Sequence, residues 1–132
     1  MNEEIFRISK SLPRAKSLMD MAADRLADIK SERKTYKIVE QYYEVMKELA
    51  TALMYADGFK TLSHKSLFSY LGINYSKSFG KDELFLMDET RKLRNDILYY
   101  GKQVDSSFLI NHEEKLKSII KKLLKLAGQK LI

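Results

Sequence analysis

The chain contains no cysteine, one proline and only five glycines among its 132 residues. Without cysteine it can form no disulfide, no thiolate nucleophile and no zinc site of the cysteine type. Proline and glycine are the strongest helix breakers, and the rest of the composition is rich in Leu, Lys, Glu and Ala, which favours an all-α fold. No run alternates apolar and polar residues with period two, so no sheet is expected.

Long apolar runs are also missing. No window approaches the roughly 18–20 apolar residues that cross a bilayer, and the N-terminus carries no apolar leader. We therefore expect a cytoplasmic protein without a membrane partner. A chain of this length forms one domain with its own core, and we expect an N-terminal arm, helical or loose, over residues 1–10 and a helical domain over residues 11–132.

Helical periodicity runs through most of the sequence. Apolar positions, N-cap residues and glycines predict five helices. The first four are expected over residues 13–35, 36–56, 63–70 and 82–100, and the fifth begins at a capping box formed by Asn111 and Glu114. The third is expected to be capped by Thr61 or Ser63 and ended by Gly72. Gly58 and Gly101 are expected to end the second and fourth helices. Four long helices with short connections predict an up-and-down four-helix bundle with one short additional helix.

The net charge of +6 is unevenly spread. The second predicted helix is acidic, whereas the last is rich in lysine. A basic face suits nucleic acid, but this one has no interleaved aromatic residue to stack a base, which favours an ordinary solvated helix. Most of the eight tyrosines are expected at the edge of the core, with the ring buried and the hydroxyl in water.

Residues 91–101 (RKLRNDILYYG) carry the most informative chemistry. With a period of 3.6 residues, one face of the predicted helix presents Asp88, Arg91, Asn95 and Tyr99. Arg, Asn and Tyr occur where donors are aimed at a planar or anionic group. The alternative is a surface helix whose arginines pair with nearby carboxylates.

The run over residues 93–101 resembles the signature helix of HEPN domains, which are small all-α modules. Residues 53–67 (LMYADGFKTLSHKSL) resemble the HEPN helix that ends at a glycine and leads into a Ser-His or Thr-His helix start. The order and spacing of helices agree over about residues 10–130. The resemblance implies a homodimer with motif helices facing across a cleft. It also implies a minimal nucleotidyltransferase (MNT) partner that modifies a tyrosine near the motif, in a toxin–antitoxin pair whose toxin half is the HEPN protein.

The sequence departs from the HEPN ribonuclease pattern at one point. Ribonuclease members carry an Arg followed, after four to six residues, by a His. Counted from Arg94, those positions hold Tyr99, Tyr100 and Gly101, so Arg94 and Asn95 match and the His does not. Tyrosine titrates near 10 in water and is a poor base at pH 7, although it donates to a phosphate or stacks on a base. Whether the chain is an enzyme stays open.

The candidate site contains a catalytic set and a wider binding groove. The catalytic set is Arg94, Asn95 and Tyr99, and the groove adds Arg91, Tyr100 and His64. No metal and no cofactor are expected.

Asn95 and Tyr99 share a helix face, whereas Arg94 and Tyr99 do not converge in one straight helix. A groove built from both needs a distorted helix or a second copy across a two-fold axis. In the alternative, Arg94 forms a structural ion pair with a carboxylate, and His64 is a capping or surface residue. The carboxylates considered for Arg94 are Asp88, Glu89 and Asp57.

Three functions follow from these residues. The first is a HEPN-type binding module that engages RNA or a nucleotide through Arg94, Asn95 and Tyr99. The second is a metal-independent endoribonuclease, in which Arg94 stabilises the pentacovalent phosphate and Asn95 positions it. The third is a scaffold whose helical surface recruits a partner protein.

Overall fold

The computed structural model describes residues 4–132, over which the chain is mostly helical with one small sheet. The elements are β1 (Ile5–Arg7), α1 (Leu12–Ile29), α2 (Thr35–Asp57), β2 (Phe59–Thr61), α3 (His64–Asn74), α4 (Lys81–Tyr100) and α5 (Ser107–Lys130). The all-α prediction is thus confirmed. Over these residues no helix combines the length and apolar character that crossing a membrane requires.

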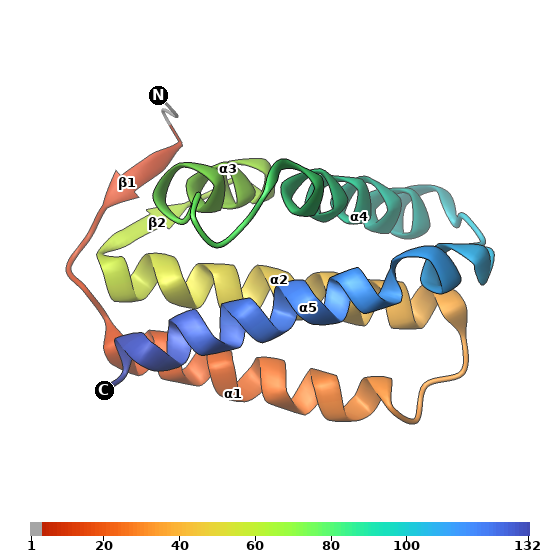
Figure 1. Cartoon of the computed structure of the whole chain (residues 1–132), viewed down its shortest axis with the longest axis horizontal. Coiled ribbons are helices and arrows are strands. Elements are labelled where there is room, and N and C mark those ends of the chain that lie inside the picture. Colours follow the sequence, from red (N-terminus) through yellow and green to blue (C-terminus); the bar gives the residue numbers. More distant parts are fainter. Residues whose placement is uncertain (1–3) are drawn as a thin grey trace.

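Helix α2 lies at the centre of the molecule, in contact with α1, α3, α4 and α5 (Figure 1). Most faces of α2 are apolar, and the helix contributes many of the buried side chains, including Tyr42, Tyr43, Met46, Leu49 and Leu53. Burying each such side chain stabilises the fold by roughly 1.5–3 kcal/mol. One strip of α2 is polar and half-buried, and consists of Glu40, Glu44, Lys47 and Thr51.

Helix α1 ends at Ile29, so the prediction that it continues to Thr35 is wrong. The cause is local. The carboxylate of Glu32 accepts hydrogen bonds from the backbone N–H groups of Arg33 (3.0 Å) and Lys34 (3.1 Å). These bonds hold the backbone in a turn that competes with continued helix.

Helix α5 begins at Ser107, which overturns the predicted capping box at Asn111 and Glu114. The extra turn brings Phe108 and Leu109 onto the core, and this burial favours helix ahead of the polar signal. Helix α3 likewise continues past Gly72 to Asn74. A Cβ at Gly72 would lie 3.1 Å from Leu84 Cδ1, so this glycine permits close packing of α4 and does not end the helix.

The small sheet corrects the expectation that no strand would form. Strands β1 and β2 pair antiparallel, with Ile5 opposite Thr61 and Arg7 opposite Phe59. Three residues are too few to show a period of two, so the strand cannot be predicted from hydrophobic periodicity. Residues 5–7 of the predicted arm are therefore paired strand, neither an extra helix nor a loose arm. Residues 1–3 of that arm lie outside the described residues.

Gly58 and Gly101 end α2 and α4, as predicted, and both adopt the left-handed conformation. Gly58 has φ 91° and Gly101 has φ 63°. A Cβ at Gly58 would also lie 3.1 Å from the backbone oxygen of Ile8, whereas a Cβ at Gly101 would meet nothing within 4 Å. The stability lost in Gly101→Ala therefore comes from the backbone conformation alone. In Gly58→Ala the close approach of the new Cβ to the Ile8 oxygen adds to that loss.

We expect Gly101→Ala to lower the free energy of unfolding by about 1 kcal/mol and Gly58→Ala to lower it by about twice as much. Urea denaturation of the two variants beside the wild type measures both losses. Equal losses would contradict the role of the close approach between Gly58 and the segment that follows β1.

Candidate functional site

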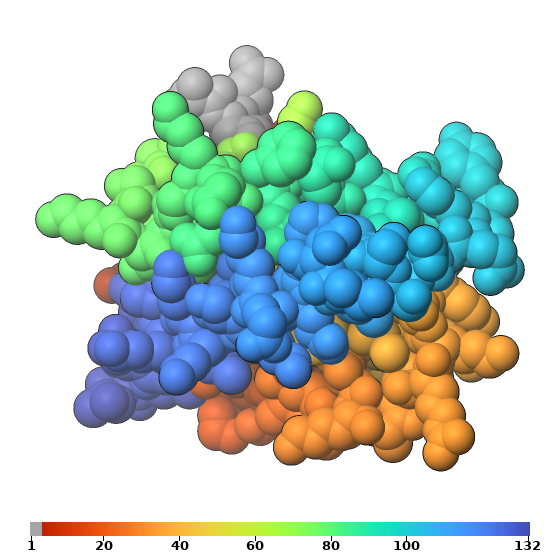
Figure 2. Space-filling view, turned by 45° about the vertical axis from the view of Figure 1, so that its right-hand side comes forward, coloured from red at the N-terminus to blue at the C-terminus, as the bar shows by residue number. Residues whose placement is uncertain are grey.

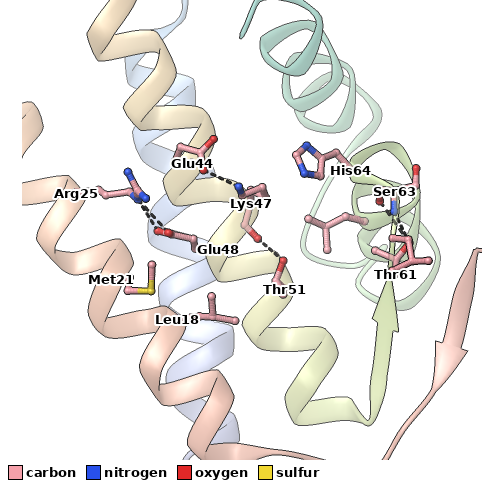
Figure 3. Close-up of a pocket in the computed structure, with 12 residues that line it drawn as sticks. Leu18, Met21, Arg25, Glu44, Lys47, Glu48, Thr51, Thr61, Ser63 and His64 are labelled. Atoms are coloured by element: carbon pink, nitrogen blue, oxygen red, sulfur yellow. Dashed lines mark hydrogen bonds and ion pairs between the residues drawn. The ribbon is translucent and has the colours of Figure 1, made fainter. Parts of the chain in front are cut away.

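The polar strip of α2 forms the floor of a groove with two hollows. The first has a volume of about 410 Å³ and lies between α1 and the start of α3 (Figure 3). The second, of about 360 Å³, lies between α1 and α4. Both are lined by Arg25 and Glu44, so they lie side by side along α2. We call this the α2 groove. Its other polar lining residues include Lys37, Glu40, Gln41, Lys47, Glu48, Thr51, Thr61, Ser63, His64 and Arg94.

One wall of the α2 groove is fixed by an ion pair between α1 and α2. Arg25 Nε lies 3.0 Å from both carboxylate oxygens of Glu48, and Arg25 Nη1 donates to Gln41 Oε1 at 3.0 Å. Glu48 is only 4% exposed. Because a buried carboxylate needs a partner, Arg25 is held in place and its charge is neutralised.

Glu44 is the centre of a second ion-pair network. Its carboxylate lies 2.6 Å from Lys47 Nζ and 3.2 Å from Arg94 Nη2. Burial alone would raise the pKa of Glu44. The hydrogen bond and charge of Lys47, together with the charges of Arg94 and Arg25, more than offset burial, so the pKa is lowered. Glu44 is therefore ionised at neutral pH, and it balances two neighbouring cations with one negative charge.

Arg94 reaches from α4 onto α2. Its guanidinium carbon lies 5.4 Å from the centroid of the Tyr43 ring, a cation–π distance, and its Nη1 donates to Asn95 Oδ1 at 3.4 Å. Arg94 does form a structural ion pair, but with Glu44, so the carboxylates considered from the sequence are the wrong ones.

The three carboxylates considered for Arg94 face elsewhere. Asp88 pairs with Arg91 at 2.8 Å, and both Asp88 and Glu89 lie within 4 Å of Lys92 Nζ. Asp57 pairs with Lys130 at the far end of α2. All of these pairs lie outside the α2 groove, so Arg94 is the arginine of α4 that lines it.

His64 forms part of the groove wall and is not the cap of α3. The capping residue is Ser63, whose Oγ accepts from the Ser66 backbone N–H at 3.3 Å. The His64 ring is half-buried, and its Nδ1 lies 2.8 Å from the Tyr43 hydroxyl. Burial, and then the charges of Lys47 and Arg94, lower the pKa of His64.

Tyr99 and Tyr100 lie outside this cluster. They are 67% and 82% exposed, and neither lines the α2 groove, whereas the preceding Leu98 does. The structure therefore brings Arg94 and His64 together with Tyr43, Glu44 and Lys47, and places the two tyrosines elsewhere within one chain. Asn95 is connected to the cluster by the hydrogen bond that its Oδ1 accepts from Arg94.

No family model, curated protein or solved structure matches the chain. The function of the molecule must therefore be inferred from the chemistry of its own surface. In the α2 groove, charged groups from α1, α2 and α4 meet the His64 ring of α3.

A further hollow of about 610 Å³ lies between α1 and α5. Figure 2 shows this face: α5 is blue, and below it the end of α1 and the connection between α1 and α2 are orange. The floor contains Ile38 and Tyr42, and the Tyr42 hydroxyl donates to Glu113 at 2.6 Å. Lys30, Lys117 and Lys121 also line this hollow, but its wall is mainly apolar. The α2 groove is the more polar of the two and is therefore the better candidate for recognition of a charged ligand.

Proposed function

We propose that the chain is a HEPN-type module, folded as an up-and-down four-helix bundle, that binds phosphate groups of RNA or a nucleotide in the α2 groove. The observation that supports this most directly is local: at Glu44 two cationic side chains share one carboxylate, within a groove lined by as many carboxylates as cations. Lys47 and Arg94 both pair with this one carboxylate, and their side chains remain 26% and 19% exposed. An entering phosphate can accept hydrogen bonds from both cations, because neither is saturated by Glu44.

The resemblance in residues 53–67 and 93–101 agrees with this location. It implies roles for Arg94 and His64, which stand 30 positions apart in the sequence (94 − 64) and meet at the α2 groove. Hydroxyl groups of Thr51, Thr61 and Ser63 line the same hollow as His64 and suit contacts to ribose.

A homodimer is part of the proposal. Leu98, Tyr99 and Tyr100 form an exposed apolar end of α4 beside the groove, with exposed fractions of 52%, 67% and 82%. Tyrosine is favoured in subunit interfaces. A two-fold axis at this end would place the partner's tyrosines near the α2 groove. In a toxin–antitoxin setting, Tyr99 and Tyr100 would also be accessible to an MNT-type nucleotidyltransferase.

Binding is tested by titrating the full chain into a fluorescently labelled RNA oligonucleotide at low salt and following anisotropy. Arg94→Gln is expected to weaken binding about tenfold, the loss of one charge-assisted hydrogen bond. It should also lower the slope of log affinity against log salt by about 1. The matched control is Lys92→Gln, which removes one positive charge from the same helix outside the groove.

Two outcomes would contradict the proposal. Either the folded protein shows no affinity for RNA or nucleotides at low salt, or the Arg94 and Lys92 variants lose affinity equally. The same samples, incubated in chelator, distinguish binding from catalysis. RNA cleavage that disappears in Arg94→Gln would establish the endoribonuclease in place of the binding module.

A further inference from the structure

Tyr43 and His64 form a buried hydrogen bond, and its donor can be identified. The Tyr43 side chain is fully buried, and its hydroxyl oxygen lies 2.8 Å from His64 Nδ1. Over residues 4–132, this nitrogen is the one hydrogen-bond partner of the Tyr43 hydroxyl. The two rings are tilted, with centroids 5.8 Å apart.

The hydroxyl must be the donor in this contact. Burial raises the pKa of Tyr43 far above the physiological range, so the phenol keeps its proton. That proton needs an acceptor, because an unpaired buried donor pays the full cost of desolvation. Nδ1 can accept it only when it carries no proton itself, and in a neutral imidazole the proton then resides on Nε2.

We propose that Tyr43 fixes His64 as an Nε2–H donor facing the α2 groove, where it and Lys47 Nζ form a subsite for one phosphate group. In Figure 3 the His64 ring lies across the groove from Lys47 and Glu44. The inference rests on the proposed function for the identity of the ligand. It adds which atoms meet the phosphate and which residue, Tyr43, positions them.

The charges around His64 select an anionic ligand with acceptor oxygens. Lys47 and Glu44 face the ring from α2, and Arg91 and Arg94 act on it from α4. Burial and the positive charges of Lys47, Arg94 and Arg91 disfavour protonation of the His64 ring. A neutral Nε2–H donor therefore adds a hydrogen bond without repelling Lys47, and a phosphate oxygen satisfies both groups.

The same tautomer gives His64 a defined chemical role. A nitrogen that carries a proton and belongs to a neutral ring does not accept another, so Nε2 does not act as a general base toward a ribose hydroxyl. His64 thus binds the ligand, and Tyr43 is a positioning residue that acts through it. The geometry favours a binding module over a ribonuclease that uses His64 as its base.

Nitrogen-15 NMR of the imidazole rings in the labelled full chain tests the tautomer without any ligand. We expect His64 of the wild type to be Nε2–H at neutral pH. In Tyr43→Phe both tautomers should become populated. The matched control is Tyr42→Phe, which removes the neighbouring buried hydroxyl that donates to Glu113 and should leave the His64 spectrum unchanged.

Inorganic phosphate serves as the probe of the subsite, with titration calorimetry as the readout in every variant and the His64 Nε2 resonance as a second readout where His64 is present. We expect His64→Leu, which removes the N–H donor, to weaken phosphate binding about tenfold. Tyr43→Phe should weaken it about twofold if the donor tautomer falls to about half of the population. The measurements on the wild type and on His64→Leu decide the case even if Tyr43→Phe does not fold.

The inference and the proposed function fail in different ways. An Nδ1–H tautomer in the wild type would overturn the inference, and RNA binding that depends on Arg94 would then still support the function. An Nε2 resonance that does not shift when phosphate is added, or a His64→Leu variant that binds phosphate as the wild type does, would overturn the subsite. A complete absence of RNA binding in the anisotropy titration would overturn the proposed function.

Discussion

Replacing Arg25 with methionine is expected to destabilise the protein by about 3 kcal/mol, because it leaves the carboxylate of Glu48 buried without its partner. The Glu48 side chain is 5% exposed and the Arg25 side chain 32% exposed. Both carboxylate oxygens of Glu48 lie 3.0 Å from Arg25 Nε. Methionine keeps the apolar stem of the arginine and removes the charge. Urea denaturation followed by circular dichroism measures the loss.

A double variant separates the cost of an unpaired charge from the cost of lost packing. Arg25→Met combined with Glu48→Leu should recover most of the stability, since an apolar pair of similar volume replaces a buried ion pair at little cost. Lys16→Met is the surface control, because Lys16 and Asp20 pair while 59% and 64% exposed and such pairs contribute little. A loss in Arg25→Met no larger than in Lys16→Met would contradict the prediction.

The helices were predictable because each long one buries a continuous apolar stripe. The errors lie where a local hydrogen bond or a distant contact competes with that pattern. Glu32 holds the backbone of the α1–α2 connection and ends α1 early. Phe108 and Leu109 extend α5 because the core covers them. Strand β1 leaves no local signal because its partner is distant in the sequence: Phe6 is opposite Lys60, 54 positions away (60 − 6).

The candidate site could be predicted only in part from the sequence. Arg94 and His64 were singled out from their motifs, and the structure places both at the α2 groove. Their partners were missed. Glu44 and Lys47 lie on the polar face of the helix predicted over residues 36–56, and the sequence does not say which helices border that face. Tyr43 was expected at the edge of the core with its hydroxyl in water. Its side chain is instead buried, and its hydroxyl forms a hydrogen bond with His64.

The small sheet that the sequence did not reveal helps to hold the site. Strand β2 ends at Thr61, whose Oγ1 accepts from the Ser63 backbone N–H at 3.1 Å. Ser63 in turn caps the helix that begins with His64. Pairing of β1 with β2 therefore restrains the chain that presents His64 to the groove. The position of one candidate binding residue thus depends on a strand pair far from the motif helix.

Asp57→Asn is expected to destabilise the protein by about 3 kcal/mol at neutral pH, because it removes the negative charge that joins three elements at one end of the molecule (Figure 1). Asp57 ends α2 and accepts hydrogen bonds from the hydroxyls of Tyr70 (2.6 Å) and Tyr75 (2.7 Å). It also pairs with Lys130 of α5 at 2.8 Å, while its own side chain is 16% exposed. The isosteric amide leaves Lys130 without a counter-charge.

The pH dependence of this loss identifies its electrostatic origin. Burial would raise the pKa of Asp57, but the hydrogen bonds from Lys130, Tyr70 and Tyr75 offset it, so the folded-state pKa lies below the ordinary value of 3.8. A lowered carboxyl pKa stabilises the folded state above the unfolded pKa, and that contribution is lost as pH falls through the folded pKa. The difference in unfolding free energy between wild type and Asp57→Asn should therefore be constant from pH 7 to about 5 and shrink toward pH 3. A difference that stays constant down to pH 3 would show that the loss comes from packing and not from the charge of Asp57.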